Sequence, residues 1–144
     1  MAIANLHETL LSYTIRKNEL TLDISNYQSL KALAVAQQAD TNSILSAGKA
    51  ELRDKFKYLY RTDEEAYRDL GYKDYTEIPE FEEELNKLTA QMQEELEELE
   101  AWETQIDNQI TTDSAELEEV KAYEESLKTM LSNNIQNDFN LTLS

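Results

Sequence analysis

Carboxylates are the most abundant reactive groups in the chain. Of its 144 residues, 30 are acidic and 13 are basic, which gives a net charge of −17. Glutamates that project into a helical bundle can hold metal ions when Glu-x-x-His pairs accompany them. The single histidine, His7, has Ala4 three residues before it. We therefore expect no metal site and no cofactor, and interpret the densest acidic run as a solvated helix face. The run comprises Glu94, Glu95, Glu97, Glu98, Glu100 and Glu103.

Other common catalytic chemistries lack their residues. The chain has no cysteine, which excludes disulfides, thiol catalysis and cysteine zinc sites. Its two glycines, Gly48 and Gly71, are 23 residues apart, whereas phosphate-binding loops need closely spaced glycines. A catalytic serine or threonine needs a neighbouring base in a rigid pocket, and long helices favour grooves instead. We expect no enzymatic activity and no small-molecule substrate.

Charge and hydropathy also limit the partners. A strongly acidic chain is repelled by phosphate backbones, so we expect no nucleic-acid partner. No segment approaches the roughly 18 consecutive apolar residues that a membrane span requires. The first residues lack the basic and apolar regions of a cleavable signal peptide. We expect a cytoplasmic protein, or one exported without a cleavable signal.

A turn interrupts two long helical arms near the middle of the sequence. Thr62 and Glu65 have the spacing of a capping box, and Gly71 suits the position after a helix end. These signals predict a short helix from about Asp63 to Leu70. Pro79 suits the first turn of the following helix. We expect a first arm at about 5–61, the turn at about 62–78 and a second arm at about 79–138.

Apolar residues recur in the first arm at the spacings of 3 and 4 that mark a heptad seam, with a gap at Lys17. Small residues follow in the middle of the arm, where we expect the seam to slip in phase. The predicted seam residues are Leu6, Leu10, Tyr13, Leu20, Ile24 and Tyr27, then Leu30, Leu33 and Ala34, then Leu45, Leu52, Phe56 and Leu59.

The second arm has the same pattern in two blocks separated by polar residues. A strict seam between the blocks would fall on Gln109, Asp113 and Glu116, so we expect a possible break near 111–114. The predicted seam residues are Leu85, Leu88, Met92, Leu99, Trp102 and Ile106, then Val120, Tyr123, Leu127 and Met130.

Two arms of similar length joined by a compact turn predict an all-α fold. We expect one domain over 1–144, a long antiparallel helical hairpin or two-helix coiled coil, associating into a larger bundle. If the turn centres near residue 70, facing residues have numbers that add to about 140. Trp102 would then face residue 38, where the alanines make room for it. They are Ala32, Ala34, Ala36 and Ala39.

The charges of the two arms support the same pairing. Residues 1–61 carry a net charge of +2 and residues 79–120 a net charge of −14. Five basic residues near the turn would lie beside the acidic residues 80–84, and such exposed pairs set register more than stability. They are Lys49, Arg53, Lys55, Lys57 and Arg61.

Aromatic and arginine side chains concentrate at the turn. Tyrosine and arginine are frequent in protein interfaces, so the tip is a candidate partner-binding surface. Alternatively, the rings pack on one another to close the end of the hairpin. The candidate tip residues are Tyr60, Tyr67, Arg68, Tyr72 and Tyr75.

The arms also carry apolar residues outside the seam, which a single hairpin would leave in water. Burying them against copies of the same chain is the usual solution. The carboxyl-terminal stretch is the candidate for this self-association through Leu127, Leu131, Ile135 and Phe139. The off-seam residues are Leu11, Ile15, Leu22, Leu30, Ile44, Leu96, Ile110, Leu117, Leu131 and Ile135.

Three functional interpretations stay open. The first is a non-enzymatic structural or assembly protein whose partners are proteins, copies of itself included. The second is an exported subunit of a helical filament or secretion apparatus, because the expected architecture resembles that of bacterial needle and flagellar-type subunits. That resemblance covers shape and composition, with no shared motif. The third is an acidic export chaperone or adaptor that holds a partner helix.

Overall fold

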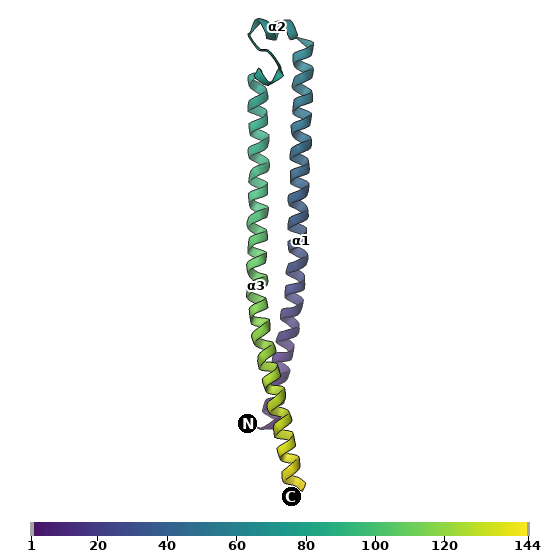
Figure 1. Ribbon diagram of the computed structural model, residues 1–144, viewed down its shortest axis with the longest axis vertical. Coiled ribbons are helices and arrows are strands. Elements are labelled where there is room, and N and C mark those ends of the chain that lie inside the picture. The colour runs from purple at the N-terminus through teal and green to yellow at the C-terminus, as the bar shows by residue number, and fades with distance from the viewer. Residues whose placement is uncertain (1, 144) are drawn as a thin grey trace. The chain divides into compact units, whose positions relative to one another are not determined.

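Helices are the only regular secondary structure in the part of the chain that the structure describes. The computed structural model describes the backbone of residues 2–143 and the side chains of residues 2–139. Its elements are α1 (Ile3–Thr62), α2 (Glu64–Asp69), the 3₁₀ helix η1 (Tyr75–Glu77) and α3 (Pro79–Leu143), with no strand among these residues (Figure 1). Helices α1 and α3 pack against each other as a hairpin, which confirms the predicted all-α class.

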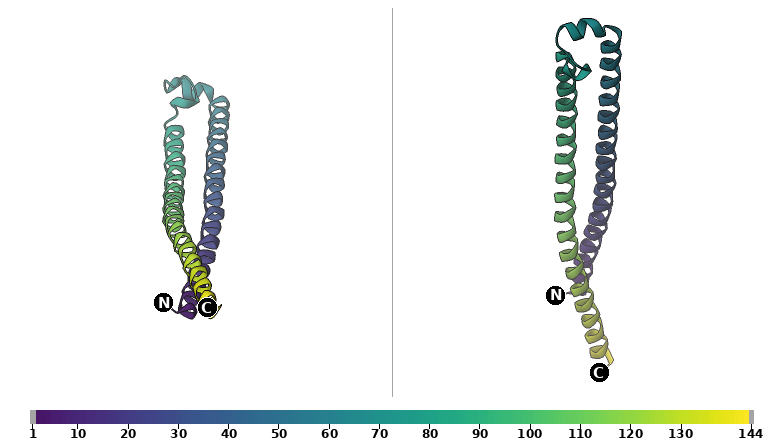
Figure 2. Two further views of the ribbon diagram at one scale, coloured as in Figure 1. Left: turned by 60° about the horizontal axis from the view of Figure 1, so that its bottom comes forward. Right: turned by 45° about the horizontal axis from the view of Figure 1, so that its top comes forward.

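The hairpin divides into two compact units. We call residues 32–104 the turn unit and the described residues of 1–31 and 105–144 the terminal unit. Each unit pairs a stretch of α1 with a stretch of α3, and the turn unit also contains α2 and η1 (Figure 2). The two units are described separately below.

The seam of α1 keeps its phase, so the predicted slip is wrong. Its buried and half-buried positions alternate at spacings of 3 and 4 from Leu6 to Leu52. Leu30 and Leu33, predicted in the seam, are 40% and 47% exposed. Polar side chains occupy the seam instead, and three of them, Lys17, Lys31 and Gln38, bond to acidic side chains of α3. The intervening positions are Leu10, Tyr13, Lys17, Leu20, Ile24, Tyr27, Lys31, Ala34, Gln38, Thr41, Leu45 and Gly48.

The seam of α3 differs from the prediction in the terminal unit. Every second seam position, at 110, 117, 124 and 131, lies one residue later than the predicted one. Tyr123 and Met130 therefore lie outside the seam and are 49% and 45% exposed. The same shift places Ile110, Leu117 and Leu131, which we expected outside the seam, in it. The observed positions are Ile106, Ile110, Asp113, Leu117, Val120, Glu124, Leu127, Leu131 and Asn134.

Helix α3 continues through Thr111–Ser114, where we considered a break. Its polar side chains are satisfied within the helix. The hydroxyls of Thr111 and Thr112 donate to backbone carbonyls four residues earlier, and the buried Asp113 carboxylate accepts from Gln109 Nε2 at 3.0 Å. Because these polar groups are hydrogen-bonded within the helix, the polar segment does not interrupt it.

The pairing of α1 with α3 has the predicted register in both units. The Lys31 ammonium lies 2.7 Å from Asp107 in the terminal unit. In the turn unit, Gln38 Nε2 donates to Glu103 at 2.7 Å, and the Lys55 ammonium lies 3.3 Å from Glu84. The residue numbers of these pairs add to between 138 and 141.

The packing expected around Trp102 is not the one observed. Only Ala34 of the four alanines is buried, and Ala32, Ala36 and Ala39 are exposed. The half-buried Trp102 instead lines a groove together with α1 residues of polar type. The direction of each side chain follows from its position in the heptad repeat, and Ala32, Ala36 and Ala39 lie at positions outside the seam.

The turn contains the predicted short helix but not the predicted capping box. The Thr62 hydroxyl donates to the Tyr58 carbonyl, and Asp63 precedes α2 without a side-chain cap. At the other end, the Gly71 amide donates to the Arg68 carbonyl at 2.9 Å and the Tyr72 amide to the Tyr67 carbonyl at 3.0 Å. This is a Schellman motif, and it requires the positive φ of 89° that Gly71 adopts.

Candidate interaction surfaces

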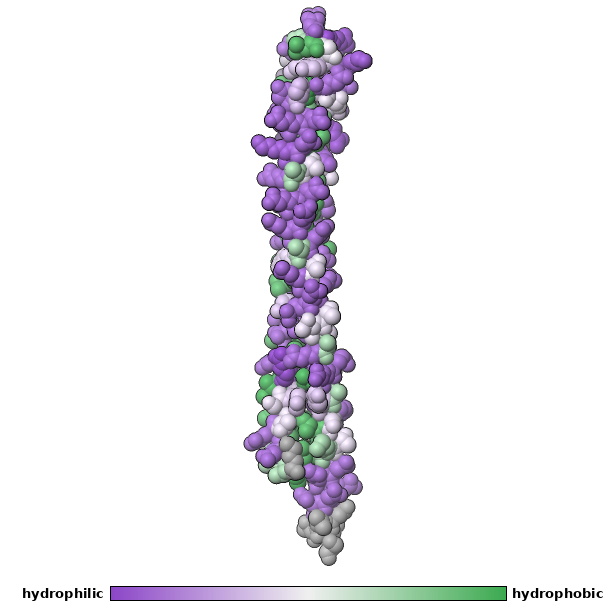
Figure 3. Space-filling view, turned by 90° about the vertical axis from the view of Figure 1, so that its left-hand side faces the viewer, coloured by the Kyte–Doolittle hydropathy of each residue, from purple (hydrophilic) through white to green (hydrophobic). Residues whose placement is uncertain are grey.

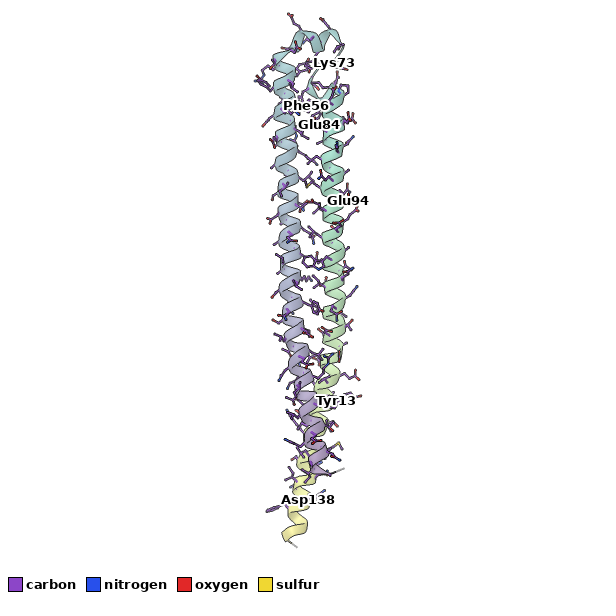
Figure 4. All side chains as sticks on the ribbon, turned by 180° about the vertical axis from the view of Figure 1, so that it is seen from behind. Tyr13, Phe56, Lys73, Glu84, Glu94 and Asp138 are labelled. Atoms are coloured by element: carbon purple, nitrogen blue, oxygen red, sulfur yellow. The ribbon has the colours of Figure 1, made fainter. Side chains whose placement is uncertain are left out.

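A cluster of aromatic and aliphatic side chains closes the turn unit. Phe56 of α1, Phe81 of α3 and Ile78 between η1 and α3 are buried against one another. The rings of Phe56 and Phe81 meet edge to face with centroids 5.4 Å apart, and Tyr75 meets Phe81 at 5.2 Å. Figure 4 labels Phe56 near the top of the paired helices. This cluster holds η1, the end of α1 and the start of α3 together.

The four tyrosines predicted at the tip are half-buried and contact one another or this cluster. The Tyr60 hydroxyl donates to the carbonyls of Tyr72 at 3.0 Å and Lys73 at 2.9 Å. The Tyr60 and Tyr67 rings stack at 5.7 Å, and Tyr67 lies 6.3 Å from Tyr72. The rings therefore close the turn internally. Partner binding by these residues stays a prediction.

Of the residues predicted at the tip, Arg68 lies on the outward surface of the turn, together with Tyr58 and Leu70, which were not predicted there. Arg68 is exposed and pairs with Glu64 on α2 at 2.6 Å. Tyr58 and Leu70 are each 67% exposed. Leu70 lines a groove of about 380 Å³ with Leu59 and other residues. The position of Leu70 directly before Gly71 was the sequence signal for its exposure. The left-handed glycine ends α2, so the residue before it lies at the end of the helix.

A buried carboxylate is the main polar feature of the terminal unit. Glu124 accepts hydrogen bonds from Lys17 Nζ at 2.9 Å and Thr14 Oγ1 at 2.9 Å, both on α1. Lys128 Nζ donates to it at 3.2 Å from the next turn of α3. The hydrogen bonds from Lys17 and then Thr14 lower the pKa of Glu124 from 4.5 to about 2. Glu124 therefore stays ionised and bonds α1 to α3.

Besides the pair of Lys31 with Asp107, an arginine–carboxylate pair and a pair of rings join the helices of the same unit. Arg16 Nε and one terminal nitrogen donate to the two carboxylate oxygens of Glu116 at 2.9 and 3.0 Å, which raises the pKa of Arg16. The rings of Tyr13 and Tyr123 stack at 5.5 Å (Figure 4 labels Tyr13). The gap in the predicted seam at Lys17 was the available signal for this polar layer. The partner Glu124 could not be predicted, because the expected seam of α3 falls on Tyr123.

The four residues predicted to mediate self-association divide into two pairs. Leu127 and Leu131 are half-buried at seam positions of α3. Ile135 and Phe139 are 51% and 62% exposed. Because facing residue numbers add to about 140 and α1 begins at Ile3, Phe139 lies beyond the first residue of α1. Figure 4 shows the end of α3, labelled at Asp138, extending past α1.

Three more apolar side chains lie exposed on α1 in the terminal unit. Leu11, Ile15 and Leu22 are 53%, 51% and 62% exposed, and their spacings of 4 and 7 place them on one face of the helix. Asn18, also exposed, lies between them on that face. We call these four residues the α1 stripe. Figure 3, which views another side of the molecule, shows hydrophobic atoms gathered near the ends of the chain.

The groove at Trp102 belongs to the turn unit alone. Its volume is about 470 Å³. Gln37, Asp40 and Thr41 line it from α1, and Glu95, Glu98, Leu99 and Trp102 line it from α3. An indole and an aliphatic side chain therefore share one concave surface with three carboxylates.

The described residues contain no group of three or more histidine, cysteine or acidic side chains that could hold a metal ion. Within the same residues, no helix has an apolar stretch long enough to cross a membrane. Glu94 and its neighbours form an exposed acidic surface on α3 (Figure 4).

Comparison with other proteins adds no family to this description. No protein-family model matches the chain, and neither a curated protein nor a solved structure is similar to it.

Proposed function

We propose that the chain is a non-enzymatic coiled-coil protein that assembles with copies of itself through the α1 stripe. The observation that supports this proposal is the exposure of Leu11, Ile15 and Leu22 on one face of α1. The opposite face of α1 already packs against α3. A second helix placed along this face would bury three large apolar side chains. Burial of each one contributes about 1.5 to 3 kcal/mol.

The charges of the terminal unit favour α1 as the contacting helix. Residues 2–31 carry three acidic and three basic side chains, whereas residues 105–143 carry eight acidic and two basic ones. Two copies that met through α3 would bring like charges together, which opposes association. Two copies that met through α1 would avoid this repulsion.

Asn18 gives the proposed contact a register. Positions 11, 15, 18 and 22 have the alternating spacing of a second seam, with a single asparagine among apolar residues. A buried asparagine in such a seam favours pairing with another asparagine and selects one alignment and one oligomeric state. We expect a discrete oligomer for this reason.

The test is sedimentation equilibrium on the full chain and on the double variant Ile15→Ser with Leu22→Ser. We expect the dissociation constant of the variant to rise by at least about 100-fold, because two apolar contacts are lost on each copy. Leu70→Ser is the control, since Leu70 is 67% exposed in the turn unit and lies outside α1. A monomeric wild type, or an equal loss in the control, would overturn the proposal.

The exposed end of α3 favours the filament subunit as a second candidate. Ile135 and Phe139 form an apolar surface apart from the α1 stripe. A chain with two different contact surfaces can form open assemblies, because the contacts between copies need not close into a ring. In that case wild-type protein should pellet as polymers when concentrated, and Phe139→Ser should abolish pelleting while leaving the smaller oligomer intact.

A further inference from the structure

The geometry points to a docking site in the turn unit for a basic amphipathic helix of another protein. The site is the groove of about 380 Å³ that Leu70 lines, which we call the turn groove. All of its lining residues belong to the turn unit. The inference does not depend on the proposed self-assembly, and it gives the partner contact predicted for the tip a definite surface.

Apolar side chains supply much of the surface of the turn groove. Phe56 and Ile78 line it and are buried, and Tyr72 lines it half-buried. Leu59 and Leu70 also line it and are 37% and 67% exposed. Exposed apolar surface that polar residues border is typical of interaction sites. A partner that covers these two leucines would remove them from water.

Hydrogen bonds of the turn hold this surface in place before a partner arrives. The Leu70 amide donates to the Ala66 carbonyl at 3.2 Å, and the Schellman motif at Gly71 ends α2 directly after Leu70. The Tyr60 hydroxyl donates to the Tyr72 carbonyl at 3.0 Å, which fixes the backbone at that side of the groove. A partner therefore loses little free energy to ordering of the turn.

The charge around the turn groove selects a basic partner. Residues 63–84 carry ten acidic and two basic side chains. The one basic residue of the lining, Lys55, is already engaged, with its ammonium 3.3 Å from Glu84 and 5.4 Å from the centre of the Phe56 ring (Figure 4 labels Phe56 and Glu84). Glu80 lines the groove and is exposed. Basic side chains beside an apolar segment would complement this surface.

The exposed apolar segments of the terminal unit do not match this charge. Arg16 and Lys17 lie within the span of the α1 stripe, but both are bonded to carboxylates of α3. Residues 132–143, at the end of α3, contain Asp138 as their single charged residue. Neither segment offers an available basic side chain to the acidic turn, so the occupant is a segment of another protein.

The walls of the turn groove favour a helix as that segment. Side chains of α1, α2 and α3 line the groove, and no strand edge is present among the described residues to pair with an extended peptide. An amphipathic helix docks in such a groove by inserting apolar side chains from one face.

A designed peptide tests the site on the full-length protein. The probe is a fluorescein-labelled peptide of about 16 residues of alanine, leucine and lysine, with the leucines on one helical face. We expect saturable binding in fluorescence anisotropy, with a dissociation constant of about 10 to 100 μM. A peptide with glutamate in place of each lysine should bind at least about tenfold more weakly. Serine in place of each leucine should have a similar effect, because the apolar contacts are lost.

Two substitutions of equally exposed residues locate the bound peptide. Leu70→Ser removes the most exposed leucine of the groove and should weaken binding at least about tenfold. Tyr58→Ser is the matched control, because Tyr58 is also 67% exposed and does not line the groove. It should change the dissociation constant by less than about twofold. Circular dichroism of both variants establishes that their helices are intact.

The proposal is overturned if the lysine peptide shows no saturable binding, or if the serine peptide binds as tightly as the leucine peptide. Equal weakening by Tyr58→Ser and Leu70→Ser would also overturn it. If Leu70→Ser lowers self-association in sedimentation, a second copy occupies the groove and the proposed partner is wrong. The double variant Ile15→Ser with Leu22→Ser should bind the peptide as the wild type does, so this inference and the proposed function can fail separately.

Discussion

The turn unit and the terminal unit join the same two helices at the same register by different chemistry. In the turn unit, the rings of Phe56, Phe81 and Tyr75 pack closely around Ile78. In the terminal unit, a buried carboxylate, Glu124, binds an ammonium and a hydroxyl from α1. Ring packing gains from apolar burial, whereas the carboxylate must remain ionised to act. The two units should therefore respond differently to truncation and to pH.

The largest effect should follow truncation of the ring cluster. Phe56→Ala removes a ring that is 2% exposed, so we expect the free energy of unfolding to fall by about 3 to 5 kcal/mol in urea titrations. Tyr58→Ala, two residues away and 67% exposed, should change it by less than about 0.5 kcal/mol. A similar loss in both variants would show that the cluster does not anchor the turn unit.

The next effect concerns pH in the terminal unit. Hydrogen bonds hold the pKa of Glu124 near 2, below its ordinary value of 4.5, so its contribution to stability is present above pH 4.5. That contribution should be lost as the pH falls from 4.5 towards 2, when the carboxylate takes up a proton and weakens its bonds to Lys17 and Thr14. Thermal unfolding of Glu124→Gln should show a smaller decrease over this range than the wild type.

Glu125→Gln is the control for the pH experiment, because Glu125 is the exposed neighbour on the same helix. It should keep the wild-type dependence on pH. If Glu124→Gln also keeps it, the polar layer does not hold the terminal unit together.

A smaller effect should separate the two glycines of the turn unit. Gly71→Ala should lower the free energy of unfolding by about 1 to 2 kcal/mol, because alanine is strained at a φ of 89°. Nothing lies within 4 Å of a Cβ placed there, so crowding does not contribute. Gly48→Ala adds a Cβ 2.9 Å from the flexible Leu88 side chain and gains helix propensity, so we expect a change below about 1 kcal/mol. Equal losses would contradict the assignment of the turn to the Gly71 backbone.

The smallest effect should come from the exposed ion pairs, one in each unit. Lys31→Gln breaks the pair with Asp107, and Lys55→Gln breaks the pair with Glu84. Each should change the free energy of unfolding by less than about 1 kcal/mol, and less still at high salt. A loss above 2 kcal/mol in either variant, measured by urea titration, would mean that the pair acts as more than a register contact.

Much of the fold could be predicted because the signals are local or periodic. Gly71 ends α2 as expected, Pro79 begins α3, and the paired residues add to about 140. The errors arose where polar residues occupy seam positions. Lys17 and Glu124 look like interruptions in a hydrophobic pattern, yet each supplies the other's partner across the hairpin. The candidate surfaces were harder to predict, since the exposure of a side chain depends on whether its position falls inside or outside the seam.

The sequence by itself determined the helices, their turn and their alignment, because helix periodicity, glycine conformation and opposite charges act between residues whose positions the chain order sets. Only the tertiary structure decided which side of each helix is buried. A shift of one residue in the seam of α3 buried Glu124 and exposed Tyr123, and the phase kept by α1 placed Thr41 beside Trp102. The physical reason is that seven residues make nearly two helical turns, so two seams that differ by one residue have similar hydrophobicity. Contacts between the two helices select one of these seams.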